Sequence, residues 1–505
     1  TDRSLTIENT SVTTPQVVRF GSIGATAITA NTLKNVVAIN GVNTSSAVVV
    51  TDDAGTAGTF DNITIQNNDI QRAFVGIYTN ATVGAGNGAN LLITQNKLDT
   101  SGANAIRYVG IYVQGADGAT VSNNSIGNFN TTNGEDDFGI WFASGTINST
   151  MSSNSVTALG MTAAAVAFGP VGLADTSSAV SSGNNIIGNT VSNISTGSSA
   201  SDSVTGILIA SGGTTVQRNT VADVNNTSTG TYGAFGIDIA SGNNVILRNN
   251  FISGVTGNMT GGAAFSTNFG IFGIRVNAGT GHQIQHNSVN MFGARAGAAS
   301  TSLLTSALCL ATTTSTGMDI RNNIFANTIT GGTTSIANVS VYLPSTGTSA
   351  MNLTMNNNDY FFGTDVARQG AGQAGTTAGT NFFTTLSALA AYSSTLHVPA
   401  TNDNSSQDVD PFFVSATDLH LQLASSLLGL GTPIGSVTVD YDNDPRPASA
   451  PDIGADEIVQ SVGGVMPSGT FYNASYYLGD TLSGDVSVTN TLYLLGVTSG
   501  AGYTT

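Results

Sequence analysis

The chain has 505 residues, of which 40% are hydrophobic, so a large core can be buried. Only 9% are charged and the net charge is −17, which disfavours nucleic acid as a partner. The single cysteine, Cys309, excludes an internal disulfide, and its apolar neighbours predict a buried, inert thiol. No apolar run is long enough to predict a membrane span.

The first 60 residues contain two irregular copies of a pattern that later becomes regular. Residues 5–9 and 36–40 each combine a short apolar stretch with an asparagine. Alternation with a period of two in short runs predicts β-strands. The chain begins without an initiator methionine or a signal peptide, from which we expect a processed or truncated piece of a longer protein.

An asparagine phrase then recurs, in which a strand ends at Asn and an apolar or aromatic residue follows two positions later. The asparagines are Asn68, Asn96, Asn124, Asn154, Asn189, Asn219, Asn249, Asn287, Asn322 and Asn358. Their spacing runs from 28 residues, between the first two, to 38 residues, between Asn249 and Asn287. A repeat of this length indicates a solenoid. Asparagine tolerates left-handed backbone and can pass amide hydrogen bonds from coil to coil, so we predict a structural ladder.

A second phrase, Gly-Ile-x-apolar, supplies another strand in most coils. The copies begin at Gly76, Gly110, Gly139, Gly206, Gly236 and Gly273, with a degraded copy at Gly172. Strands of one kind that repeat without crossover helices predict an all-β, right-handed parallel β-helix, with coils about 4.8 Å apart.

The regular pattern stops after residue 360. We predict a β-helix over residues 1–400, with one short helix over 382–392, and a closing segment over 401–458. A Gly/Val/Ser linker is predicted at 459–469, followed by a β-rich tail at 470–505. Within the tail, residues 484–505 alternate as a strand and are predicted to pair with another subunit.

Two parts of the sequence resemble a known family. Residues 1–10 and 105–113 resemble right-handed parallel β-helix surface proteins of Bacteroidota, and the stretch PDIGADE at 451–457 resembles their C-terminal closing segment. The resemblance implies export by the type IX secretion route and attachment to the cell surface. It implies no reaction, because most members of that group have none assigned.

An aromatic stripe is the candidate ligand-binding surface. The residue after Ile in each Gly phrase is expected to point outward, because strand residues alternate between the two faces. On three neighbouring coils this residue is Tyr78, Tyr112 or Trp141. Aromatic rings stack on sugar rings, which suggests glycan binding. The competing interpretation is that the stripe packs under a loop or against a neighbour.

A run of three acids, Glu135, Asp136 and Asp137, precedes Trp141, and Arg107 lies one coil earlier. Paired carboxylates serve in glycoside hydrolysis, and acidic calcium ligands with a basic residue serve in lyases. A solvated acidic loop is the simpler interpretation.

Asp440, Asp442 and Asp444 alternate as calcium ligands do, and calcium is the only cofactor that the sequence suggests. Pro445 occupies the position where such a loop needs glycine, so a structural turn is the competing interpretation. His282 and His286 would lie about 13 Å apart on a strand, too far to share a metal ion. His420 has no evident partner.

Two functional hypotheses follow. The first is a non-enzymatic extracellular structural or adhesive protein, such as a filament subunit that assembles end to end with copies of itself or with further segments of a longer chain. The second is a polysaccharide-binding module, a polysaccharide lyase or a glycoside hydrolase that uses an outer face of the β-helix. Scarce lysine, abundant Thr and Asn and the lack of cysteine pairs favour a bacterial cell surface.

Overall fold

The computed structural model describes residues 3–458, except 130–134, 163–168, 198–202, 229–231, 259–261, 263, 296–301 and 332–335. Thr1–Glu457 forms one compact unit and Ile458–Thr505 a second. The first unit is a parallel β-solenoid of about 11 turns, which confirms the predicted fold. The predicted linker and tail lie outside the described residues.

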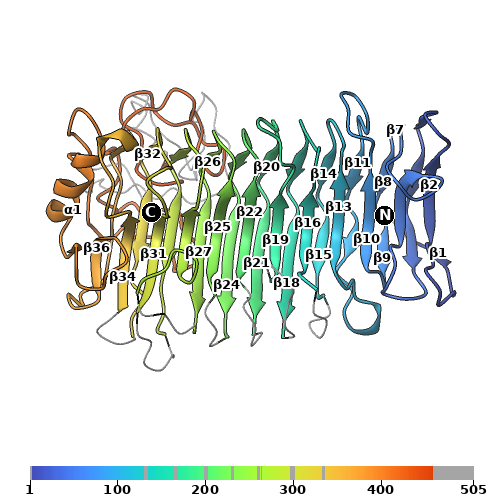
Figure 1. Cartoon of the computed structure of the whole chain (residues 1–505), viewed down its shortest axis with the longest axis horizontal. Helices are drawn as coiled ribbons and strands as arrows, with labels where there is room; N and C mark the ends of the chain where they lie inside the picture. Colours follow the sequence, from blue (N-terminus) through green and yellow to red (C-terminus); the bar gives the residue numbers. More distant parts are fainter. Residues whose placement is uncertain are drawn as a thin grey trace, which may run out of the picture. The chain divides into compact units, whose positions relative to one another are not determined.

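Three parallel sheets make the walls of the solenoid, and most coils contribute one strand to each (Figure 1). Sheet A contains β1 (Leu5–Glu8), β5 (Val36–Ile39), β9 (Asp69–Gln71), β12 (Lys97–Leu98), β15 (Ser125–Gly127), β18 (Ser155–Met161), β21 (Thr190–Thr196), β24 (Thr220–Asn226), β27 (Phe251–Gly257), β30 (Ser288–Met291) and β33 (Ile324–Asn327). Sheet B contains β2 (Val18–Ser22), β6 (Val48–Asp52), β10 (Val75–Asn80), β13 (Val109–Gln114), β16 (Phe138–Phe142), β19 (Val171–Asp175), β22 (Val204–Ala210), β25 (Ala234–Ser241), β28 (Ile271–Val276), β31 (Leu303–Leu310), β34 (Ile336–Leu343), β36 (Gln369–Ala374) and β37 (Phe382–Phe383). Sheet C contains β4 (Thr32–Lys34), β8 (Thr64–Gln66), β11 (Leu92–Thr94), β14 (Thr120–Ser122), β17 (Thr150–Ser152), β20 (Asn185–Ile187), β23 (Thr215–Gln217), β26 (Ile246–Arg248), β29 (Gln283–Gln285), β32 (Asp319–Arg321) and β35 (Thr354–Asn356).

The smaller elements lie at the two ends of the stack and in its connections. They are β3 (Ile28–Thr29), β7 (Phe60–Asp61), the 3₁₀ turns η1 (Gly102–Asn104), η2 (Ser349–Met351) and η3 (Ser394–Leu396), and the helix α1 (Leu386–Ser393). The helix begins later than predicted, because Phe382 and Phe383 pair antiparallel with β36. Thr385 caps it by accepting a hydrogen bond from the Ala388 amide at 3.2 Å. Leu389 of α1 is fully buried, so the helix covers this end of the core (Figure 1).

The core is a set of apolar columns inside the sheets. Ile77 pairs in register with Ile111, which pairs with Ile140, and all three are fully buried. Because apolar residues stack at each step, burial of apolar area repeats from coil to coil and stabilises each interface between coils. No helix in the described part of the chain is long and apolar enough to cross a membrane.

The asparagine ladder runs along the corner between sheets C and A. At every step the side-chain Nδ2 of one asparagine donates to Oδ1 of the asparagine on the next coil, at 2.9 to 3.0 Å. The rungs are Asn68, Asn96, Asn124, Asn154, Asn189, Asn219, Asn250, Asn287, Asn323 and Asn358. Each amide is buried, so the ladder satisfies polar groups that would otherwise be costly inside the solenoid.

Two of the predicted rungs are wrong by one residue. Asn249 and Asn322 precede the true rungs, Asn250 and Asn323, and have φ angles of 53° and 59°. The residue before each rung turns the corner in left-handed backbone, which asparagine adopts readily. The sequence was ambiguous because Asn-Asn is followed there by two apolar residues. Ile252 and Phe325 are the ones that enter the core, so the rung is the second asparagine of each pair.

Steric hindrance explains why glycine occupies the first position of each Gly-Ile-x-apolar phrase. A Cβ added to Gly206 would lie 2.5 Å from the carbonyl oxygen of Gly236 and 2.4 Å from Cγ1 of Val221. Gly110 and Gly139 meet the next coil in the same way. A side chain at this position of the sheet B strand would therefore collide with both the backbone and the core, and only glycine fits.

Candidate functional site

The predicted stripe forms part of a larger aromatic face on the outer side of sheet B. We use "aromatic face" for Phe74, Tyr78, Tyr108, Tyr112, Phe138 and Trp141, which lie on or just before β10, β13 and β16. Tyr78 pairs in register with Tyr112, and Tyr112 with Trp141. All three are half-buried. The structure thus aligns the three residues on neighbouring coils, as the repeat predicts.

The rings of this stripe are not equivalent. Tyr78 and Tyr112 stack on each other, with centroids 5.1 Å apart and planes 8° from parallel, so their adjoining faces are already occupied. Trp141 meets Tyr112 edge to face at 5.2 Å. It also stacks on Phe138, at 4.4 Å and 20°. Phe138 is only 3% exposed and lies beneath Trp141. The surface left for a ligand is therefore one face of the indole ring, beside the edges of two tyrosine rings.

Polar groups border the aromatic face. The Tyr112 hydroxyl donates to Oε1 of Gln114 at 2.5 Å, and Nε1 of Trp141 donates to the Thr176 hydroxyl at 2.7 Å. Burial raises the pKa of Tyr112 to about 12, so its hydroxyl stays protonated at neutral pH and keeps its hydrogen bond to Gln114. A flat apolar ring flanked by fixed amide and hydroxyl groups has the composition of a sugar-binding surface.

The three consecutive acids that precede this face, Glu135, Asp136 and Asp137, each have a different environment. Glu135 forms a bidentate ion pair with Arg107, in which Nε donates to Oε2 at 3.2 Å. Oδ1 of Asp136 accepts from the Gly169 amide at 3.0 Å. Asp137 is 1% exposed, and burial raises its pKa well above the usual range. Each of the three acids thus has its own environment: an ion pair, a backbone hydrogen bond or burial.

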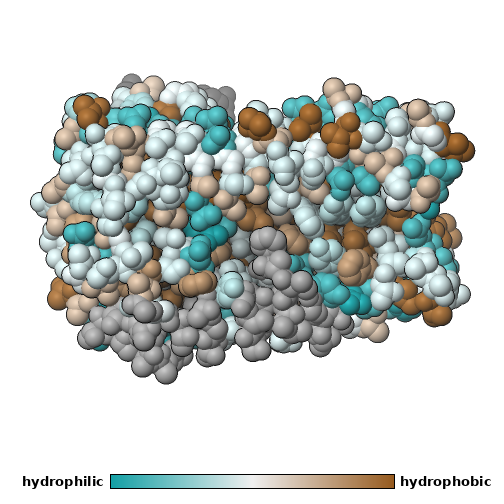
Figure 2. All heavy atoms as spheres, viewed as in Figure 1, coloured by the Kyte–Doolittle hydropathy of each residue, from teal (hydrophilic) through white to brown (hydrophobic). Residues whose placement is uncertain are grey.

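Farther along the outer side of sheet B, on β25, β28 and β31, the side chains are buried by contacts within the protein. Arg275 forms a buried bidentate ion pair with Asp238, at 2.8 and 2.6 Å, and lies 3.9 Å from the ring centroid of Phe235. Phe265 packs over this region, and its amide donates to the Thr376 carbonyl. Cys309 is fully buried there, as predicted. Figure 2 shows apolar side chains in a recess over β16, β19 and β22, next to the aromatic face.

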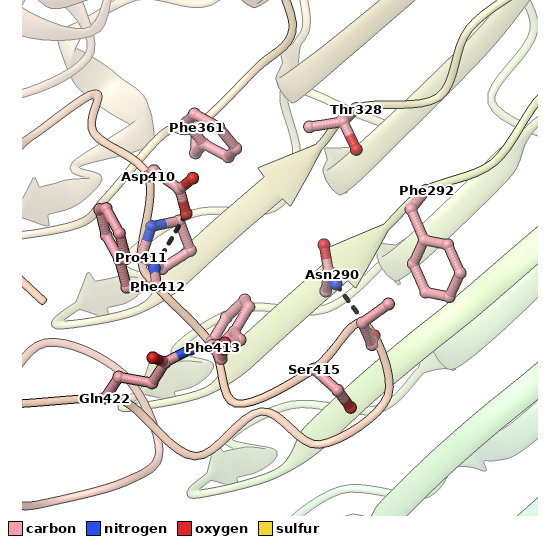
Figure 3. Close-up of a pocket in the computed structure, with 11 residues that line it drawn as sticks. Asn290, Phe292, Thr328, Phe361, Asp410, Pro411, Phe412, Phe413, Ser415 and Gln422 are labelled. Atoms are coloured by element: carbon pink, nitrogen blue, oxygen red, sulfur yellow. Dashed lines mark hydrogen bonds between the residues drawn. The ribbon is translucent and has the colours of Figure 1, made fainter. Parts of the chain in front are cut away.

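A pocket missed by sequence analysis lies between sheet A and the closing segment (Figure 3). It has a volume of about 430 Å³ and is lined by Phe292, Phe361, Phe412 and Phe413, with polar groups from Asn290, Asp410 and Gln422. Phe412 has a φ of 54° and is 45% exposed. Asp410 holds this turn by accepting from the Phe412 amide at 2.9 Å. An exposed aromatic residue in left-handed backbone is unusual and marks a second surface for testing.

The predicted calcium triplet does not share one site. Oδ1 of Asp440 accepts from the amides of Asp442 and Asp444, at 2.9 and 2.7 Å, and its Oδ2 accepts from the Glu457 amide at 3.0 Å. Asp440 therefore closes a turn, which is the competing interpretation given above. Asp442 instead meets His420, whose partners the sequence did not reveal.

No protein-family model matches the chain, and a search of curated proteins gives no match either. The functional assignment therefore rests on the fold and on the geometry of the described residues.

Proposed function

We propose that the protein is a non-enzymatic, adhesive β-solenoid of a bacterial cell surface that binds polysaccharide through its aromatic face. The stacking of Trp141 over buried Phe138, beside the edges of Tyr112 and Tyr78, supports this proposal most strongly.

Trp141 gains its orientation from packing, before any ligand is present. Phe138 supports one face of the indole, and Thr176 accepts a hydrogen bond from its ring nitrogen. A ring held in this way loses little side-chain freedom when a ligand stacks on it. The apolar C–H face of a sugar can pack on such a ring while its hydroxyls bond to neighbouring polar groups.

A polymer is favoured over a single sugar because the aromatic face extends along the stack. Tyr78, Tyr112 and Trp141 lie on three successive coils, separated by the strand spacing of about 4.8 Å. A chain of sugars lying along the solenoid axis would therefore meet a new aromatic residue at each coil.

A binding role fits the charges better than catalysis does. Glu135 is neutralised by Arg107, and Asp137 is buried. An adhesive role also fits the resemblance to surface β-helix proteins of Bacteroidota, which is part of this proposal. End-to-end assembly through residues 484–505 is kept as a further hypothesis, and it concerns residues outside those described.

The test is binding to a panel of soluble polysaccharides by isothermal titration, with the wild-type chain and the variant Trp141→Leu. Leucine keeps an apolar side chain but removes the flat ring. We expect the affinity for any bound polysaccharide to fall about two- to tenfold, since aromatic stacking contributes about 0.5–1.5 kcal/mol beyond area burial.

Phe412→Ala is the matched aromatic control, because it removes an exposed ring from the separate pocket. It should leave the affinity unchanged. If Phe412→Ala abolishes binding while Trp141→Leu does not, the pocket is the glycan site and the assignment to the aromatic face is wrong. If no polysaccharide binds to the wild type, the proposed function itself is contradicted.

A further inference from the structure

The closing segment folds back onto sheet A and brings distant acidic residues together around one histidine. The Tyr441 ring stacks on Phe251 of β27 at 3.9 Å, and its hydroxyl lies 2.5 Å from the Thr220 hydroxyl. Leu419 and Ala455 are fully buried in the same contact. Residues near 420, 442 and 456 therefore converge on one place, although the chain separates them.

Three side chains there present ligand atoms to a common point. One nitrogen of His420 and one oxygen each from Asp442 and Asp456 all lie within 4.8 Å of one another. Nε2 of His420 is 2.7 Å from Oδ2 of Asp442. Oδ2 of Asp456 accepts from the Leu421 amide at 2.7 Å, which fixes the carboxylate of a residue only 7% exposed. Asp442 is exposed, so solvent can reach the cluster.

The imidazole is held as metal-binding histidines usually are. Its other nitrogen, Nδ1, hydrogen-bonds to Oδ1 of Asp418. A carboxylate on the second ring nitrogen fixes the tautomer and makes the free nitrogen a better metal ligand. Phe251 and Tyr441 meet the His420 ring edge to face, at 4.9 and 5.7 Å, and so fix its plane.

We propose that His420, Asp442 and Asp456 bind a divalent transition-metal ion such as Zn²⁺, with Asp418 positioning the imidazole. One imidazole and two carboxylates suit such an ion, whereas Ca²⁺ takes six to eight oxygen ligands. The ion takes the place of the proton between Nε2 and Oδ2, and that proton is released to solvent. The three ligands come from three separate parts of the closing segment, so the ion's role is to hold those parts together where the segment packs on sheet A.

The test uses the full chain, stripped of metal with a chelator and titrated with ZnCl₂, CaCl₂ and MgCl₂ by isothermal titration calorimetry. We expect one Zn²⁺ per chain and an affinity for Zn²⁺ at least tenfold above that for Ca²⁺. Asp442→Asn should weaken Zn²⁺ binding at least 100-fold. Asp418→Asn should weaken it about 10- to 100-fold, as losses of such supporting carboxylates do.

Asp444→Asn is the matched control, since Asp444 is exposed on the same loop but lies outside the cluster. It should bind Zn²⁺ as the wild type does. Circular dichroism in chelator verifies that each variant is folded, and the visible spectrum of the wild-type chain with Co²⁺ reports tetrahedral coordination without any mutation. Zn²⁺ binding that Asp442→Asn leaves unchanged, or tighter binding of Ca²⁺, would overturn the proposal. If Asp442→Asn leaves Zn²⁺ binding unchanged, the contact between His420 and Asp442 is only an ion pair.

Discussion

Replacing Asn219 with alanine is expected to lower the free energy of unfolding by about 3–5 kcal/mol, since each buried polar group left unpaired costs about 1–3 kcal/mol. Oδ1 of Asn219 accepts from both the backbone amide and Nδ2 of Asn189, at 2.9 and 3.0 Å. Its Nδ2 donates to Oδ1 of Asn250 and to the Ile186 carbonyl. Alanine leaves these groups buried and without these partners.

Asn185→Ala is the control, because Asn185 belongs to the neighbouring coil but its Nδ2 donates to the nearby Gly183 carbonyl, in an exposed position. We expect a change of less than about 1 kcal/mol there. Urea denaturation gives both values, and hydrogen exchange at the Asn189 amide reports the local loss. If the two substitutions lowered the free energy of unfolding equally, the asparagine ladder would contribute no more to stability than an exposed asparagine does.

Gly206→Ala is expected to be the other severe substitution. The new Cβ would lie 2.5 Å from the Gly236 carbonyl oxygen and 2.4 Å from Cγ1 of Val221, and both atoms are held by stacked coils. Overpacking of this kind costs about 1–3 kcal/mol and occasionally more. Since a rigid backbone cannot yield as a side chain can, we expect about 3 kcal/mol or failure to fold.

Gly84→Ala separates this steric effect from the general effect of replacing glycine. A Cβ at Gly84 would have no atom within 4 Å, and the residue is exposed. The substitution should be neutral or stabilise by up to about 1 kcal/mol, through lower entropy of the unfolded chain. Thermal denaturation of both variants is the measurement, and a Gly206→Ala protein as stable as the wild type would contradict the steric explanation.

The fold could be predicted from the sequence because every coil of a solenoid repeats the same sequence pattern. Period-two alternation, the asparagine phrase and the Gly phrase each report a local constraint that recurs in every coil. The ladder was misplaced only where Asn-Asn precedes two apolar residues. There Phe251 points outward to Tyr441 and Ile252 points inward, a difference that hydrophobicity alone does not encode. The pairs Asn67–Asn68 and Asn123–Asn124, in which the second asparagine is the rung, carried the missing signal.

The candidate sites were less predictable, because they depend on contacts that no repeat specifies. The register of Tyr78, Tyr112 and Trp141 followed from the repeat, but the stacking of Trp141 on Phe138 did not. Asp440 was predicted with Asp442 because they alternate in sequence. In the structure Asp442 turns to His420, 22 residues away, because the closing segment folds back onto sheet A. Long-range packing of this kind leaves no pattern in a single sequence.

The most direct test of the central claim uses the fluorescence of Trp141, which is the only tryptophan in the chain. Polysaccharide is titrated into the wild-type protein while the emission spectrum is recorded, and binding is measured in parallel by calorimetry. Stacking of a sugar on the indole should give a saturable change in emission, with the same dissociation constant as the calorimetric value. Binding detected by calorimetry without any change in the emission of Trp141 would contradict the assignment of the aromatic face.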